Sequence, residues 1–131
     1  MKTMLRPYLR LMRFPLVFTA IGDAWAVRWM AADVSGGWAV PPAGELALLA
    51  GVSFCLYGFG MVLNDTLDAG GDAVASPARP IPSGQVKRGH AAALAIAFAV
   101  AGLALAWPLG RPSFDIAVVT AVLILGYDGG L

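Results

Sequence analysis

Four long apolar stretches run through this sequence, and polar or turn-rich segments separate them. They cover residues 14–32, 45–67, 90–108 and 114–127. A helix needs about 20 mostly apolar residues to cross the hydrocarbon core of a bilayer. Lipid offers no hydrogen bonds to an open backbone, so helices are the natural form for such stretches. The pattern therefore predicts an all-α fold, a multi-pass transmembrane helical bundle whose last helix is short for a full crossing.

Composition supports a membrane protein and excludes some functions. Hydrophobic residues make up 59% of the chain and charged residues only 13%, whereas soluble domains carry about 25% charged residues. This argues against a soluble helical bundle, such as a soluble isoprenyl diphosphate synthase. A formal net charge of +1 gives no strong attraction to nucleic acid, so no nucleic-acid partner is expected.

Basic residues predict the orientation in the membrane. If the polar segments alternate between the two sides, most Lys and Arg residues fall on one side, which is the cytoplasmic side in membrane proteins. We therefore expect a multi-pass protein of the cell (plasma) membrane with a cytoplasmic N-terminus and a cytoplasmic loop over residues 68–89. The basic residues of that side are Lys2, Arg6, Arg10, Arg13, Arg79, Lys87 and Arg88, and those of the other side are Arg28 and Arg111.

Four polar residues stand at the end of the second apolar stretch: Asn64, Asp65, Asp68 and Asp72. If the helix continues, the three acids are spaced i, i+3 and i+7 along one face, and Asn64 lies one turn before Asp68. Like charges on one helix face repel each other, so a cation is expected beside them. Mg²⁺ takes oxygen ligands and commonly bridges one or two carboxylates to substrate phosphates. All four residues are therefore candidate metal ligands.

Downstream basic residues complete a candidate site for a diphosphate. Arg79, Lys87 and Arg88 are suited to phosphate oxygens that a metal leaves uncovered. Acids, metal and basic residues at a membrane surface suggest a diphosphate carried on a lipid. A solvated cytoplasmic loop with no ligand is the alternative. Another candidate, Asp23, lies within the first apolar stretch, where an acid normally faces a cavity or a partner. It is expected to contact substrate or to form a structural pair.

The same residues carry a resemblance to a known family. "NDTLDAGGD" resembles the first aspartate-rich motif of the UbiA superfamily of intramembrane prenyltransferases, and "RPIPSGQV" is similar to the segment that follows it. "LRLMRFP" and "LGYDGGL" resemble the basic entry to helix 1 and the end of helix 4 in that family. The resemblance implies transfer of a prenyl group from an isoprenyl diphosphate to an aromatic or other lipophilic acceptor, with Mg²⁺ as cofactor.

The resemblance also implies roles for individual residues. Asn64, Asp68 and Asp72 match the catalytic residues that bind metal and diphosphate, and Asp65 matches a common additional acid. Arg79 matches a loop arginine placed near the diphosphate.

The sequence departs from the family in its second half. The family has about nine helices that cross the bilayer and a second motif, D-x-x-x-D, in its second half. In residues 1–131 this spacing occurs only within the first motif, as Asp68–Asp72, and Asp115 and Asp128 are isolated. We therefore expect these residues to be the N-terminal part of a UbiA-type domain that is inactive alone and prone to self-association. The alternative is a small four-helix membrane protein, either an inactive pseudoenzyme or a divalent-cation-binding protein.

Overall fold

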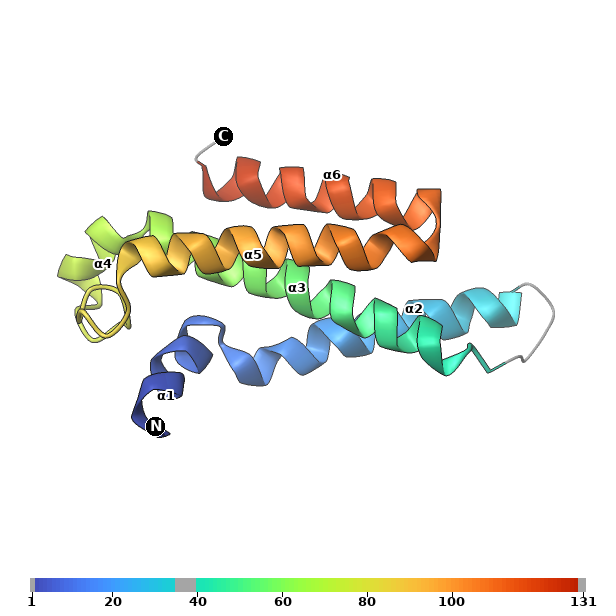
Figure 1. Cartoon of the computed structure of the whole chain (residues 1–131), viewed down its shortest axis with the longest axis horizontal. Coiled ribbons are helices and arrows are strands. Elements are labelled where there is room, and N and C mark those ends of the chain that lie inside the picture. The colour runs from blue at the N-terminus through green and yellow to red at the C-terminus, as the bar shows by residue number, and fades with distance from the viewer. Residues whose placement is uncertain (1, 35–39, 130–131) are drawn as a thin grey trace.

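The computed structural model describes residues 2–34 and 40–129, and the regular elements within these ranges are all helices (Figure 1). The predicted all-α architecture is therefore confirmed for the described residues. In chain order the elements are α1 (Lys2–Leu11), η1 (Phe14–Leu16), α2 (Val17–Val34), α3 (Ala43–Leu67), α4 (Ala69–Ala75), α5 (Arg88–Ala106), η2 (Trp107–Leu109) and α6 (Arg111–Asp128).

The four predicted stretches correspond to α2, α3, α5 and α6, with ends shifted by a few residues. The first stretch begins as the 3₁₀ turn η1, because Pro15 within it has no N–H to donate. The prediction of a loop over residues 68–89 is wrong in its first part. Asp68 keeps helical backbone angles, the N–H of Asp72 donates to the carbonyl of Asp68 at 2.9 Å, and α4 follows. α4 ends at Ala75, and the residue that follows, Ser76, precedes a proline and so disfavours helix.

Two of the described segments are long and apolar enough to cross a membrane by length and composition. They are α3 and the continuous stretch Arg88–Leu109, which joins α5 to η2. α2 and α6 are each 18 residues long, and each contains three charged residues. In α2, the charge of Arg28 is compensated by a partner on α3, because its Nε lies 2.5 Å from Oε1 of Glu45. An interhelical ion pair of this kind lowers the cost of placing a charge within a helical bundle in lipid.

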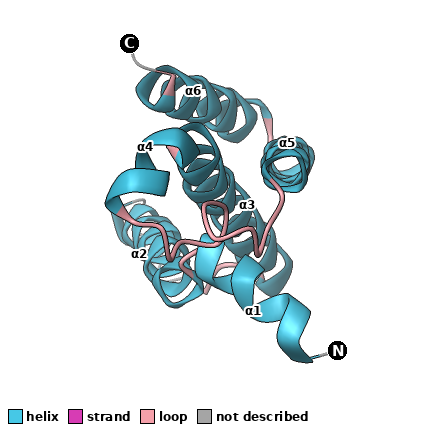
Figure 2. Cartoon of the chain, turned by 90° about the vertical axis from the view of Figure 1, so that its left-hand side faces the viewer, coloured by secondary structure: helices cyan, strands magenta, loops and turns pink. Residues whose placement is uncertain are grey.

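α3 is the central helix of the bundle. It contacts α2, α5 and α6, as the end-on view of Figure 2 shows. The closest packing is against α5, where a Cβ added at Gly102 would lie 3.2 Å from Cβ of Cys55 and one at Gly58 would lie 3.1 Å from the ring of Phe98. Small residues of this kind let membrane helices approach closely.

Replacing Gly102 by leucine should therefore destabilise the protein in detergent by about 1–3 kcal/mol, the usual cost of overpacking. The atom opposite is Cβ of Cys55, which cannot move without its helix. Thermal unfolding followed by circular dichroism measures the effect. Gly22→Leu is the matched control, because apart from its chain neighbours and the backbone of its own helix no heavy atom lies within 4 Å of the position of its Cβ. Equal midpoints for the two variants would contradict this account of the α3–α5 interface.

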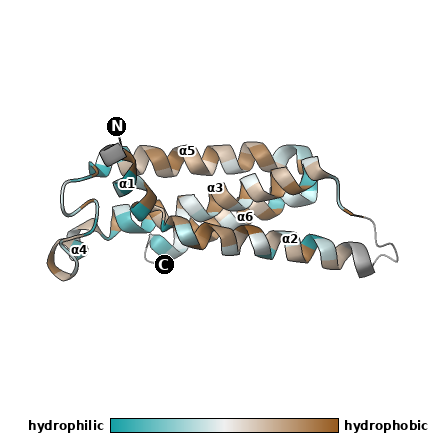
Figure 3. Cartoon of the chain, turned by 90° about the horizontal axis from the view of Figure 1, so that it is seen from below, coloured by the Kyte–Doolittle hydropathy of each residue, from teal (hydrophilic) through white to brown (hydrophobic). Residues whose placement is uncertain are grey.

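The polar part of the molecule gathers at one end of the bundle. α1, α4 and the loop between α4 and α5 lie there, next to the end of α3 (Figures 1 and 2). Coloured by hydropathy, this end is largely hydrophilic, whereas the long helices are mostly hydrophobic (Figure 3). The fold thus places the acidic motif at a polar end of an otherwise apolar bundle.

Candidate functional site

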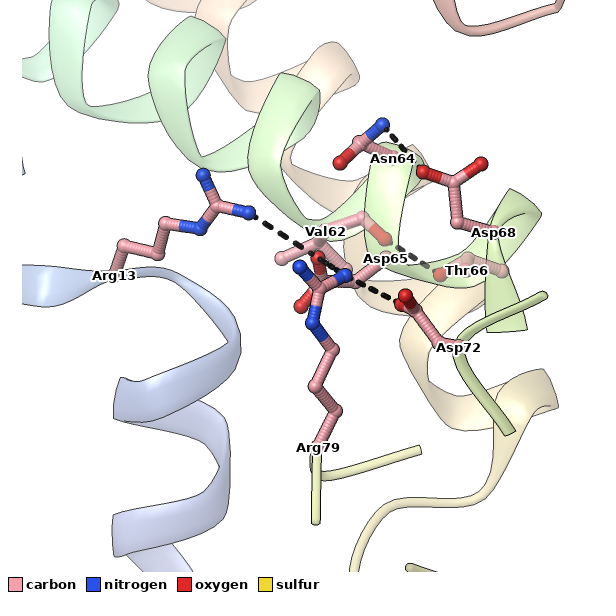
Figure 4. Close-up of polar contacts among 8 residues, drawn as sticks. All are labelled: Arg13, Val62, Asn64, Asp65, Thr66, Asp68, Asp72 and Arg79. Carbon is pink, nitrogen blue, oxygen red and sulfur yellow. Dashed lines mark hydrogen bonds and ion pairs between the residues drawn. The ribbon is translucent and has the colours of Figure 1, made fainter. Parts of the chain in front are cut away.

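The end of α3 and the start of α4 carry the four residues of the acidic motif (Figure 4). Asn64 and Asp65 lie in the last turn of α3, Asp68 joins the two helices, and Asp72 lies in α4. The four side chains do not all contact the same neighbouring residues. They divide into two neighbouring groups, one around Asn64 and Asp68 and the other around Asp65 and Asp72.

In the first group, Asn64 Nδ2 donates a hydrogen bond of 3.0 Å to Oδ2 of Asp68. Asp68 is exposed, so its carboxylate is open to a ligand. Asn64 also lines a cavity of about 470 Å³, together with Arg13, with Thr120, Tyr127 and Asp128 of α6 and with apolar residues of α3 and α6. This cavity is therefore mostly apolar with a polar end, a combination suited to a ligand with an apolar tail and a charged head.

In the second group, two arginines surround a buried carboxylate. Asp65 is only 6% exposed, and its Oδ1 lies 3.7 Å from Nη2 of Arg13 and 3.6 Å from Nη1 of Arg79. Arg79 also donates a hydrogen bond to Asp72. That hydrogen bond raises the pKa of the Arg79 guanidinium above its ordinary value, so Arg79 stays positively charged. Arg79, predicted near the diphosphate, is thus held beside the acidic motif.

Arg13 is a member of this group that sequence reasoning missed. Within the described residues it is the one non-glycine residue with positive φ, at 47°, and such a conformation is uncommon outside glycine. It stands in the turn between α1 and η1, next to the buried residues Leu11 and Met12. The available signal was its place in "LRLMRFP", immediately before the first apolar stretch.

A second cavity, of about 630 Å³, lies on the arginine side of the motif. Its described walls come from the end of α1 and the turn that follows it, from the end of α3 and from the loop after α4. The residues that line it are Arg10, Arg13, Asp65, Ser76, Pro77, Ala78, Arg79 and Pro80. The cavity is therefore lined by three guanidinium groups and one carboxylate, which is the chemistry of an anion site.

Other residues predicted for the site lie elsewhere. Lys87 is exposed and directly precedes α5. Arg88 donates from Nε to the carbonyl of Thr66 at 2.9 Å and so ties α5 to the end of α3. Asp23 is exposed on α2, and no ion pair or side-chain hydrogen bond joins it to another described residue. The structure thus brings neither Lys87 nor Asp23 into the two groups around the motif.

The donor set fits a hard divalent cation in part. Within residues 2–34 and 40–129, no group of three or more His, Cys, Asp or Glu side chains could hold a metal ion by itself. Mg²⁺ needs only one or two carboxylates when waters and substrate phosphates complete its shell. Asn64 and Asp68, with Asp72 nearby, supply oxygens of that kind, whereas Asp65 faces two guanidinium groups.

Comparison with known proteins gives a consistent result. The model of the UbiA prenyltransferase family matches residues 16–131. Proteins named digeranylgeranylglyceryl phosphate synthase are similar in sequence: that of Sulfolobus acidocaldarius is 33% identical over 96% of this chain and 44% of its own length. That of Saccharolobus solfataricus is 35% identical over 94% of this chain and 42% of its own.

A solved structure, from work on the biosynthesis of digeranylgeranylglyceryl phosphate synthase in membranes, has a similar fold. Its TM-score is 0.87 at 26% sequence identity, and the match covers 99% of this chain and 44% of the other. The chain thus spans less than half the length of these relatives.

Proposed function

Because the chain belongs to the UbiA prenyltransferase family, we propose that it forms part of an integral membrane prenyltransferase. The intact protein, meaning these residues with any chain that accompanies them in the cell, would use an isoprenyl diphosphate as donor and a lipophilic acceptor. The observation that carries the proposal is the placement of Asn64, Asp68, Asp72 and Arg79 at one end of α3 and beside it, within the segment that the family model covers.

The chemistry assigns separate tasks to these residues. In the reaction, the C1–O bond of the prenyl diphosphate breaks, an acceptor atom bonds to C1 and loses a proton, and pyrophosphate leaves. Bound Mg²⁺ would supply positive charge to the departing pyrophosphate. Asn64, Asp68 and Asp72 would hold the Mg²⁺ ion. Arg79 would bind phosphate oxygens through N–H groups not used by Asp72, and the apolar walls of the cavity beside Asn64 would accept the start of the prenyl chain.

The names of the relatives narrow the acceptor. The sequence alone leaves aromatic and other lipophilic acceptors open. The similar proteins are named as synthases of a glyceryl phosphate lipid, and this favours a glycerol phosphate lipid as acceptor for the present chain. A phosphate on the acceptor would also need a cationic group, which Arg10 of the second cavity offers.

An assay of membranes that contain the intact protein tests the proposal. Labelled geranyl, farnesyl and geranylgeranyl diphosphates are offered with a glycerol phosphate lipid, an aromatic quinone precursor or no acceptor. We expect a labelled product with the lipid, and loss of that product when Mg²⁺ is removed. No product from any pair of substrates would contradict the proposal and favour an inactive membrane protein.

The orientation in the membrane is part of the proposal. Ser83 is exposed in the loop after α4, on the side where the basic residues predict cytoplasm. A Ser83→Cys variant on intact cells should react with a membrane-impermeant maleimide only after permeabilisation. The native Cys55 is buried and should give little background. Ser113→Cys, at the start of α6, is the matched variant for the opposite side and should react without permeabilisation. Reversal of the two results would overturn the topology.

A further inference from the structure

Asp65 differs from the other acids of the motif in its surroundings. Asp68 is exposed, and Asp72 accepts a hydrogen bond from Arg79. Asp65 is buried, and its Oδ1 has no hydrogen-bond partner among the described residues. A buried carboxylate is costly unless opposite charges compensate it. The nearest described cations are Arg13 and Arg79, so these two guanidinium groups make the burial of Asp65 tolerable.

The two arginines come from segments far apart in the chain. Arg13 lies in the turn before η1, and Arg79 lies in the loop after α4. Both line the cavity of about 630 Å³, as do Arg10 and Asp65 itself. Figure 4 shows the side chains of Arg13 and Arg79 reaching Asp65 from two separate segments, with Asn64 and Asp68 to one side. The attraction to one buried carboxylate thus brings both arginines to the same cavity.

We propose that Asp65 is a positioning residue that fixes Arg13 and Arg79 at the wall of this cavity, so that they bind the diphosphate of the donor, and that it does not ligate the metal. This inference rests on the proposed function. Each guanidinium has five N–H donors in a rigid fork, so Asp65, together with Asp72 in the case of Arg79, leaves donors free for phosphate oxygens. A divalent cation on Oδ1 of Asp65 would lie close to two positive charges, which repel it. Such a cation would meet less repulsion on the side of Asn64 and Asp68.

The test separates binding of an anion from binding of the metal. Isothermal calorimetry with inorganic pyrophosphate, on the intact protein in Mg²⁺-free detergent buffer, measures the arginine site without catalysis. We expect Asp65→Asn to weaken this binding about tenfold, an effect of the size found for residues coupled within one salt-bridge network. Arg13→Gln should weaken it by a similar factor, and the double variant should be little worse than either single one, because both act through the same contact. Asp115→Asn, on α6 and away from the motif, should leave Mg²⁺-free binding unchanged.

Turnover at varied Mg²⁺ gives the second readout. Asp68→Asn should raise the Mg²⁺ concentration needed for half-maximal rate, whereas Asp65→Asn should leave that concentration unchanged and raise the KM for the prenyl diphosphate. An equal Mg²⁺ shift in both variants would overturn the inference and leave the proposed function standing. Absence of turnover in the wild-type protein would contradict the proposed function. The calorimetry would still show whether Asp65 is needed for pyrophosphate binding. Should Asp65→Asn fail to fold, unchanged pyrophosphate binding by Arg13→Gln alone would overturn the inference.

Discussion

Replacing Asp68 by asparagine in the intact protein should lower the rate of prenyl transfer by a factor of about 100 to 1,000, the usual loss when one group that stabilises developing charge is removed. Asp68 is the exposed acid of the motif, and the amide of Asn64 orients its carboxylate through a hydrogen bond of 3.0 Å. Asparagine keeps the size of the side chain but removes the negative charge that would hold Mg²⁺. The measurement is kcat in membranes with saturating donor, acceptor and Mg²⁺.

Asp115→Asn is the matched control. Asp115 is also an exposed acid, and it lies near the start of the long helix α6. Its described partner is Arg111, one turn earlier, whose Nε lies 3.0 Å from Oδ1 of Asp115. Such an exposed pair contributes little to stability, and Asp115 has no place in the candidate site. Wild-type turnover in the Asp68 variant would remove this residue from the metal site. A comparable loss in the Asp115 variant would show that the assay reports a general effect of lost charge.

The helices were predictable because their signal is local. The stretch 45–67 is apolar throughout and emerges as α3, which differs from the prediction by only two residues at its start. α4 was not predicted, since its sequence "AGGDAVA" contains two glycines, which are poor helix formers. Its formation depends on continuation of the helical backbone through Asp68, and this does not show in composition or periodicity.

The only residues of the candidate site that could be predicted are those that lie close together in one segment of the sequence. Asn64, Asp68 and Asp72 are recognised by their spacing, and their metal-binding role stays a prediction. A straight helix would place the acids on one face, but Asp65 and Asp72 share Arg79 while Asp68 pairs with Asn64.

Arg13 and Asp128 could not be assigned from spacing. Arg13 reaches the motif because the turn before α2 packs near the end of α3, and Asp128 because α6 returns beside α3 to line a cavity with Asn64. Such contacts depend on tertiary packing between segments distant in sequence.

Residues 1–131, purified alone in detergent, should show no prenyl transfer, which is the other large effect expected. In the ranges that the structure describes, no three His, Cys, Asp or Glu side chains form a metal-binding group. A site that clamps a diphosphate between metal ions needs ligands on both sides of it, and the acidic motif supplies one side. The sequence relatives are more than twice as long as the region they share with this chain. The cavity beside Asn64 and Asp128 would therefore lack part of its wall, and we expect self-association to cover that face.

Light scattering coupled to size exclusion measures the association, and the assay with labelled prenyl diphosphate and glycerol phosphate lipid measures the activity. The control is the intact protein in the same detergent. The comparison is valid only if this control shows prenyl transfer. A variant of residues 1–131 with Asp68→Asn supplies the background. Turnover by residues 1–131 that exceeds this background would contradict the prediction. If that turnover rose with the square of the protein concentration, a second copy of the chain would be completing the site, because only a dimer can place a second acidic motif opposite the first.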